Sequence, residues 1–215
     1  GPNGLTAAAV LARAGLRVRV LEAADTIGGG VRTEALTLPG FRHDVGSAVH
    51  PAALTSPIFR ALGLHRVVSW LNPDASYAHP LDRGPAAIAW RDIDRTADDL
   101  GPDGRAWLAM TRPLARHINE LVTFTGDQLI RMPRHPLTAV RYGLRVLEQG
   151  TGLGAASFRT PRAAALLAGA MAHANTWMPS LASAAAGLLL TAQAHAGGWP
   201  VPHGGAQTIA EALAA

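Results

Sequence analysis

The chain opens with a helical period of apolar residues that gives way to a strand period. Residues 5–14 are mostly Ala, Val and Leu and are followed by Gly15, which predicts a helix that ends at the glycine. The run Val18–Leu21 predicts a β-strand directly after that helix. Pro39-Gly40 is a turn signal, and the alternating residues around it predict a hairpin whose second arm is 41–45.

The pattern changes near residue 53, where short strands and then helices replace the opening arrangement. A short helix over 55–62, ended by Gly63, is predicted to precede a small antiparallel sheet. Its strands are expected at 67–71, 77–81 and 86–90. From Asp94 onward the apolar period is helical.

Apolar residues recur every three or four positions in this helical part, which predicts amphipathic helices. One set marks a helix that Pro113 is expected to kink or restart: Trp107, Met110, Leu114, Ile118 and Leu121. The next set is expected to leave Arg141 and Arg145 on the solvent-exposed face of a second helix: Leu137, Val140, Leu144 and Leu147.

Two further helices and a turn complete the predicted elements. Thr160-Pro161 is an N-cap with proline at the first helical position, so a helix is predicted to run to about Ala172. Another is predicted from Ser180 to His195, ended by Gly197-Gly198. Three large side chains near these helices are predicted to lie in the core: Trp177, Met178 and Trp199.

Composition narrows the classes of function. The 215 residues carry a net charge of +4, and all 19 basic residues are scattered arginines, so a nucleic-acid partner is not expected. The absence of Cys excludes thiol catalysis and suits a cytoplasmic protein. The nine His lack metal-ligand spacing, so no metal is expected. The apolar runs at 163–171 and 181–194 are shorter than a transmembrane segment requires.

The first residues fit the end of a dinucleotide-binding fingerprint. Gly1, Pro2, Asn3 and Gly4 match the last four positions of G-x-G-x-x-G, and Glu22 closes the predicted strand about 20 residues on. A helix N-terminus binds the diphosphate of such a cofactor, and the terminal carboxylate accepts hydrogen bonds from a ribose. The fit needs a strand and a first glycine before residue 1. Residues 1–215 are therefore expected to be a fragment, inactive alone and weak in cofactor binding.

The segment after Glu22 resembles the second glycine motif of flavoproteins of the amine oxidase and phytoene desaturase superfamily, R-x-G-G-R-x-x-[S/T]. Three residues match the motif: Gly28, Gly29 and Thr33. Thr26 and Gly30 stand where the motif has arginines, and Arg32 is a candidate for supplying the missing cation. Ala23 is grouped with these residues as a predicted cofactor contact.

Residues 38–51, LPGFRHDVGSAVHP, sharpen the resemblance to the bacterial phytoene dehydrogenase-like oxidoreductases, which depend on FAD. The resemblance implies that the small-residue corner after the hairpin approaches the isoalloxazine ring: Gly46, Ser47 and Ala48. His50 lies beside this corner, but no residue is identified as catalytic. Residues 199–213 resemble the P-x-G-G-x-x-x-L-x-x-A-L element of the same superfamily.

The resemblance implies an α/β fold with an incomplete Rossmann-like βαβ unit and an inserted, largely helical α+β substrate domain. The FAD-binding domain is expected at 1–52 and again at 198–215, and the substrate or cap domain at 53–197. The implied reaction is hydride removal from a C–H of a small molecule, apolar or amine-type, to flavin N5.

Two alternatives remain open. An NAD(P)-dependent dehydrogenase or reductase would use Glu22 in the same way, although the glycine run 28–30 and the long helical insert argue against a plain Rossmann domain. A truncated, non-catalytic chain that binds no cofactor is the second alternative, because the first strand and first glycine of the fingerprint are missing.

Overall fold

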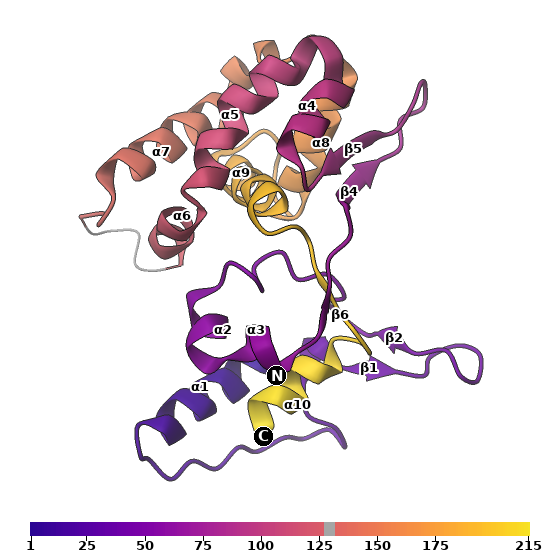
Figure 1. Ribbon diagram of the computed structural model, residues 1–215, viewed down its shortest axis with the longest axis vertical. Helices are drawn as coiled ribbons and strands as arrows, with labels where there is room; N and C mark the ends of the chain where they lie inside the picture. Colours follow the sequence, from indigo (N-terminus) through magenta and orange to yellow (C-terminus); the bar gives the residue numbers. More distant parts are fainter. Residues whose placement is uncertain (127–131) are drawn as a thin grey trace. The chain divides into compact units, whose positions relative to one another are not determined.

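The computed structural model describes residues 1–126 and 132–215, which divide into two compact units. Unit 1 comprises Gly1–Asn72 and Pro200–Ala215, and unit 2 comprises Pro73–Trp199 (Figure 1). Residues 53–72 therefore pack with the N-terminal segment. Each unit has its own apolar core. The described part is mixed α/β, dominated by helices with small antiparallel sheets.

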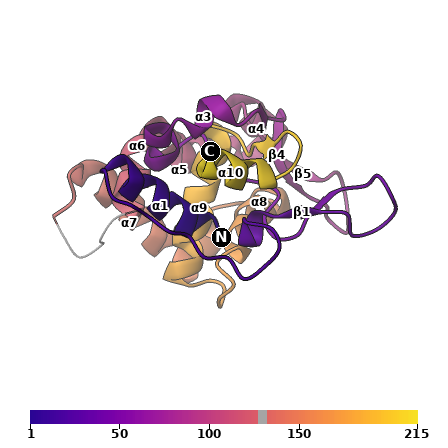
Figure 2. The same ribbon diagram turned by 90° about the horizontal axis from the view of Figure 1, so that it is seen from below.

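Unit 1 combines four α-helices with two short antiparallel sheets among its described residues. The helices are α1 (Pro2–Arg13), α2 (Pro57–Leu62), α3 (Leu64–Val67) and α10 (Gln207–Ala214), and a 3-10 turn covers Gly29–Val31. Strand β1 (Thr33–Glu34) pairs with β2 (His43–Asp44), and β3 (Trp70–Leu71) pairs with β6 (Val201–Pro202). Figure 2 shows α1 beside α10.

Helix α1 forms as the sequence predicts. Pro2 occupies its first turn, where a missing N–H costs no hydrogen bond, and Gly15 follows its end with φ of +83°. Leu5 is the buried residue of the helix and joins a core with Leu64 and Ile209. The C-terminal segment is thus packed against the N-terminal helix in one core.

The prediction of a β-strand at Val18–Leu21 is wrong, because these residues do not pair with a neighbouring strand. A β-strand needs a neighbouring backbone, and none of the described residues pairs with this segment. Its side chains are consequently exposed, Leu21 to 86 %. The described residues contain no parallel sheet, so the βαβ unit is not formed here.

The other predictions for unit 1 hold in part. The hairpin is present, with Gly40 in its loop at φ of +87°, but its strands are shorter than expected and exclude the alternating residues before the turn. The helix expected at 55–62 begins at Pro57 after the N-cap Ser56. The strand expected at 67–71 is reduced to β3, because Val67 ends α3.

Unit 2 is a helical layer with one two-stranded sheet among its described residues. Strands β4 (Ala75–His79) and β5 (Ala87–Trp90) are antiparallel, which confirms the pairing expected for these segments. The helices are α4 (Ile93–Leu100), α5 (Gly104–Arg116), α6 (Ile118–Thr125), α7 (Pro136–Gly150), α8 (Pro161–Ala172) and α9 (Leu181–Ala196), with 3-10 turns at Gly101–Asp103 and Gly152–Ala156. Within the described ranges, every helix is too short or too polar to cross a bilayer.

The core of unit 2 follows the predicted apolar period. All five residues of the first predicted set are buried in one cluster with Leu166 and Leu188. Pro113 lies inside α5 without interrupting it, and the break comes at His117, between α5 and α6. The proline therefore neither ends nor restarts the helix.

Helix α8 begins where the sequence predicts, and a buried carboxylate holds its N-terminus. Asp103 is 2 % exposed and accepts hydrogen bonds from the backbone N–H groups of Arg159 and Thr160, both at 2.8 Å, and from the Thr160 hydroxyl at 2.5 Å. Ser180 begins α9 with a capping box to Ser183, as its position predicts.

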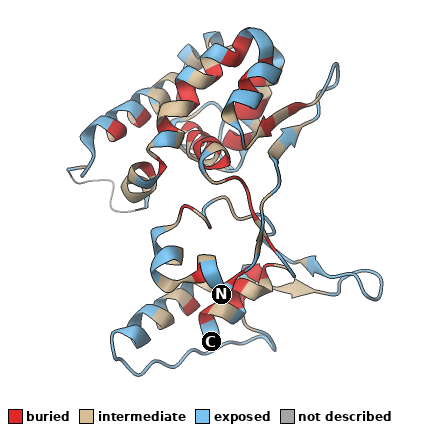
Figure 3. Cartoon of the chain, viewed as in Figure 1, coloured by how far each residue is buried: buried red, intermediate tan, exposed pale blue. Residues whose placement is uncertain are grey.

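Helix α7 forms where a second amphipathic helix is predicted, and Arg141 is exposed as expected, but the apolar stripe of the helix also faces outward. Its buried positions are Thr138, Tyr142, Gln149 and Gly150, whereas Leu137, Val140, Leu144 and Leu147 are exposed to between 52 and 63 % (Figure 3). The Tyr142 hydroxyl donates to the Ala185 carbonyl at 2.7 Å, which fixes the inward face. The prediction that the apolar stripe is buried is therefore wrong.

Of the three large side chains assigned to the core, only Trp199 is buried. Its indole N–H donates to the Leu190 carbonyl at 3.2 Å. Trp177 is 90 % exposed and Met178 is 48 % exposed, because both lie in the connection between α8 and α9. Hydrophobicity alone does not place a residue in the core when its segment is a loop.

Candidate cofactor site

Backbone segments from the two glycine motifs meet at the N-terminus of α1. A Cβ atom added to Gly29 would lie 2.9 Å from the Gly1 Cα atom, closer than carbon atoms approach without displacement. Gly29 has φ of +55° and Gly28 has φ of +119°, which favour glycine at both positions. The structure therefore brings the predicted first and second glycine motifs into direct contact.

The N-terminus of α1 faces this junction with free donors. Leu5 is the first residue whose N–H bonds within the helix, to the Gly1 carbonyl at 3.2 Å. The N–H groups of Asn3 and Gly4 thus have no partner within the helix, and no acidic side chain lies in the first turn. With the positive end of the helix dipole behind them, these donors suit an anion such as a diphosphate.

Glu22 lies beside the same helix start. Its Oε1 atom accepts hydrogen bonds from the N–H groups of Ala23 at 2.9 Å and Ala24 at 3.2 Å, and its Oε2 atom is 3.8 Å from the Gly1 amino nitrogen. The backbone donors of Ala24 and Ala23 lower the pKa of the Glu22 carboxyl. The group is therefore ionised at neutral pH and turned toward the glycine junction.

Arg32 lies against the second glycine motif but is not a free cation. Its Nε atom donates to the Gly29 carbonyl at 3.2 Å, and its Nη1 atom is 3.1 Å from the Glu34 carboxylate. The guanidinium is therefore close enough to the glycines to contact a cofactor there. Its charge is partly neutralised by Glu34.

The small-residue corner after the hairpin is fastened to the same motif. The Ser47 N–H donates to the Gly30 carbonyl at 2.9 Å, and the Val45 N–H donates to the Arg32 carbonyl at 2.9 Å. A Cβ atom on Gly46 would lie 2.4 Å from the Gly30 carbonyl oxygen. Ser47 and Ala48 are exposed on the other side of the corner, so that surface is open.

Thr33 and Asp44 join the hairpin to the returning C-terminal segment. The Thr33 hydroxyl donates to Asp44 Oδ1 at 2.6 Å and accepts from the Gln207 N–H at 3.0 Å, and Asp44 Oδ1 also accepts from the Ala206 N–H at 2.8 Å. The two side chains thus satisfy donors at the start of α10. Gly205 is required here, because an added Cβ would lie 2.5 Å from the Thr33 hydroxyl oxygen.

Sequence reasoning did not assign roles to Asp44 and Gln207. The Gln207 side-chain amide donates to the Ile27 carbonyl at 3.1 Å, so this residue fixes the loop that precedes the second glycine motif. The signal for Asp44 was its position two residues before the glycine corner. Nothing local in the sequence pointed to Gln207, because its partners are distant along the chain.

His50 is held in a partly buried position near the corner. The backbone N–H of His50 donates to the Pro200 carbonyl at 2.9 Å. The imidazole ring packs edge-on against Trp70, with ring centroids 6.1 Å apart. Burial lowers the pKa of the imidazole, which favours the neutral ring. Its Nε2 atom is buried and lacks a hydrogen-bond partner among the described residues.

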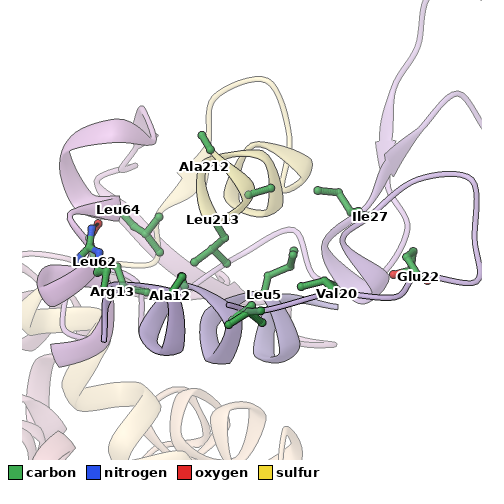
Figure 4. A pocket seen from close by; sticks show the side chains of 15 residues that line it. Leu5, Ala12, Arg13, Val20, Glu22, Ile27, Leu62, Leu64, Ala212 and Leu213 are labelled. Carbon is green, nitrogen blue, oxygen red and sulfur yellow. Dashed lines mark hydrogen bonds between the residues drawn. The ribbon is translucent and has the colours of Figure 1, made fainter. Parts of the chain in front are cut away.

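A cavity of about 600 Å³ runs along α1 next to this site (Figure 4). Small and apolar side chains of α1, Leu5, Ala8 and Ala12 among them, form one wall, and Val20 and Leu213 line it from other segments. Glu22 lies at its border. An apolar groove beside a helix suits a packed polypeptide segment better than a charged diphosphate.

The structure thus gathers all the predicted cofactor residues in unit 1. A family model, described as flavin containing amine oxidoreductase, matches residues 3–215. No curated protein matches the chain. The match covers nearly the whole sequence, and the family consists of oxidoreductases whose implied cofactor is FAD. The chain therefore belongs to the flavin-containing amine oxidoreductases.

Proposed function

We propose that the chain is part of an FAD-dependent oxidoreductase of the phytoene dehydrogenase-like group, which removes a hydride from a C–H of an apolar or amine-type small molecule. Two contacts carry the proposal, that of Gly1 with Gly29 and that of the corner at Gly46 with Gly30. These backbone segments meet where side chains would collide. Such a surface lets a flat, charged cofactor lie against peptide groups.

The residues present fit FAD. The free N–H groups of Asn3 and Gly4 would hold the diphosphate, and the ionised Glu22 would accept hydrogen bonds from the adenosine ribose. Ser47 and Ala48, exposed at the corner, would lie along the ring system. FAD, when bound, supplies the acceptor for a hydride removed from the substrate.

The protein's own contribution is binding and orientation. The hydrogen bonds from Ser47 to Gly30 and from Val45 to Arg32 hold the corner rigidly. His50 is a titratable residue beside the corner, and its buried Nε2 atom has no hydrogen-bond partner among the described residues. We infer a positioning role for His50 through its contacts with Trp70 and Pro200.

We also infer that the apolar groove along α1 receives a β-strand from outside residues 1–215. Its walls are apolar, and the extended segment 18–21 beside it has no strand partner among the described residues. A strand there would pair with this segment and support the α1 N-terminus. Residues 1–215 alone are therefore proposed to bind FAD weakly and to be inactive, so the flavin-loaded protein of the FAD tests is a longer chain that includes this strand.

Binding of a nicotinamide dinucleotide is the competing function, because Glu22 serves either adenosine. The described part of the chain contains short antiparallel pairs and a helical layer in place of alternating strands and helices, which favours the flavoprotein. A visible spectrum of the protein purified with its native cofactor separates the two. Flavin absorption supports FAD, and only ultraviolet nicotinamide absorption contradicts it.

We expect FAD to be bound without a covalent link. The 215 residues contain no Cys to form a thioether, and the site offers hydrogen-bond donors and a carboxylate. Acid denaturation of the flavin-loaded protein should release a yellow supernatant whose mass is that of FAD. Colour that remains in the precipitate would refute this prediction.

Glu22→Ala should weaken FAD retention by about tenfold to a hundredfold, because a charge-assisted hydrogen bond contributes about 1.5–3 kcal/mol. The side chain is on the surface, so the fold should persist. Equilibrium dialysis of the flavin-loaded protein measures the change. Asp25→Ala is the matched control, since this exposed acid lies three residues away. Equal affinity in wild type and Glu22→Ala would show that the ribose carboxylate is misassigned.

A further inference from the structure

A cavity of about 320 Å³ lies in unit 2 among the end of α7, the 3-10 turn Gly152–Ala156 and helix α8. Large apolar residues form much of its lining: Phe158, Leu167, Met171 and Met178. At the packing density of a protein interior, a cavity of this size encloses about ten to fifteen non-hydrogen atoms. Every lining residue belongs to unit 2, so the cavity includes none of the predicted cofactor residues.

The cavity is open to solvent along α8. Ala164 and Ala168 line it, and both are exposed. They lie four residues apart and therefore on the same face of the helix. Because neither side chain is larger than a methyl group, a small molecule can enter from solvent beside them.

Gln149 supplies a buried polar group to the lining and is 6 % exposed. Its side-chain nitrogen donates to the Ser157 hydroxyl at 2.8 Å, and that hydroxyl donates to the Glu148 carboxylate at 3.2 Å. A serine hydroxyl has one proton to donate, so its bond to Glu148 requires the Gln149 nitrogen, and not the oxygen, to face Ser157. The Oε1 atom of Gln149 then accepts no hydrogen bond from the described part of the chain.

This amide oxygen lies at the wall of the cavity that Gly154 forms. A Cβ atom added to Gly154 would be 3.0 Å from Gln149 Oε1, and Gly154 itself lines the cavity. Thr151 is the other polar side chain of the lining, and its hydroxyl already donates to the Leu147 carbonyl at 2.8 Å. A buried acceptor without a donor is unfavourable, and a ligand that brings an N–H or O–H group would satisfy it.

We propose that this cavity binds a compact aromatic ring that carries one N–H or O–H donor, such as an indole or a phenol. The donor would bond to Gln149 Oε1, and the ring would contact Phe158 and the thioethers of the two methionines, which interact favourably with aromatic rings. None of the lining residues is charged, which disfavours an ionised ligand. This binding site goes beyond the proposed oxidoreductase function and needs no flavin.

Equilibrium dialysis of the full chain against indole and against benzofuran tests the proposal. The two molecules have nearly the same shape, but benzofuran has a ring oxygen where indole has its N–H group, so the comparison isolates the donor. The wild-type chain should bind indole saturably and about tenfold more tightly than benzofuran, because benzofuran leaves Gln149 Oε1 without a donor. Gln149→Met keeps an unbranched side chain without the amide and should bind the two molecules equally.

Ala168→Leu should fill the cavity from α8 and weaken the binding of both molecules by about tenfold or more. The matched control is Ala182→Leu, because Ala182 is exposed in α9 and lies outside the lining. It should bind both molecules like the wild type, and thermal unfolding should show that each variant is folded. Ala168→Leu keeps the proposal testable if Gln149→Met does not fold.

Three results would overturn the proposal: no saturable binding of indole, equal affinity of the wild-type chain for indole and benzofuran, or wild-type affinity in Ala168→Leu. All of these measurements are made without flavin. Their failure would therefore leave the proposed FAD-dependent function untouched.

Discussion

Asp103→Ala is expected to lower the free energy of unfolding of unit 2 by about 3–5 kcal/mol, because three donors would lose a charged acceptor in a buried site. Those donors are the N–H groups of Arg159 and Thr160 and the Thr160 hydroxyl. Burial raises the pKa of the Asp103 carboxyl, but the hydrogen bonds from Thr160 and Arg159 outweigh this and lower it overall. Urea denaturation followed by circular dichroism measures the loss.

Asp98→Ala is the control, because Asp98 is exposed in α4 and the same change there removes no buried acceptor. It should alter stability by less than about 0.5 kcal/mol. Asp103→Asn should fall between wild type and Asp103→Ala, since the amide keeps one oxygen acceptor but turns an N–H₂ group toward a donor. A change below about 1 kcal/mol in Asp103→Ala would mean that the α8 N-terminus does not depend on this carboxylate.

Helix ends were predictable from sequence because their signals are local. Thr160-Pro161 and Ser180 begin α8 and α9 where predicted, and Gly63 ends α2 with φ of +77°. The same holds for the apolar period in α5, whose buried residues include Trp107 and Leu114. Where a helix begins and ends depends mainly on residues within one helical turn, and the sequence shows those residues directly.

Features that depend on distant partners were not predictable. The segment 18–21 has a strand-forming sequence, yet it remains unpaired because a strand is defined by its neighbour. Helix α7 has a clear apolar stripe, but Tyr142 and Gln149 find polar partners inside the unit and turn that stripe outward. Periodicity shows that a helix has two faces without saying which one is buried.

The candidate site, too, was predictable only in its local features. The glycines at 28–30 and the corner at 46–48 were predicted as cofactor residues, and the structure places them against each other. The hydrogen bonds of Asp44 to Ala206 and of Gln207 to Ile27 were missed, since each spans more than 160 residues. The cofactor roles of the predicted residues stay predictions, which substitution can test.

Gly46→Ala is expected to weaken FAD retention by about a hundredfold and to destabilise unit 1. The added Cβ would lie 2.4 Å from the Gly30 carbonyl oxygen and 3.1 Å from the Gly30 Cα and carbonyl carbon atoms. All three are backbone atoms, so the clash is relieved only by moving the corner and breaking the hydrogen bond from Ser47 to Gly30. Overpacking of this kind costs about 1–3 kcal/mol, and the upper end corresponds to about a hundredfold in affinity.

Gly30→Ala separates loss of fold from loss of cofactor contact, because a Cβ built at Gly30 meets no atom within 4 Å. Thermal unfolding should therefore be unchanged in Gly30→Ala and shifted to lower temperature in Gly46→Ala. Dialysis of the flavin-loaded variants gives the second measurement. Weaker FAD binding by Gly30→Ala at unchanged stability would mean that the cofactor passes over the second glycine motif. Wild-type stability and FAD retention in Gly46→Ala would show that the corner and the motif are not in contact, and the proposed arrangement of the site would fail.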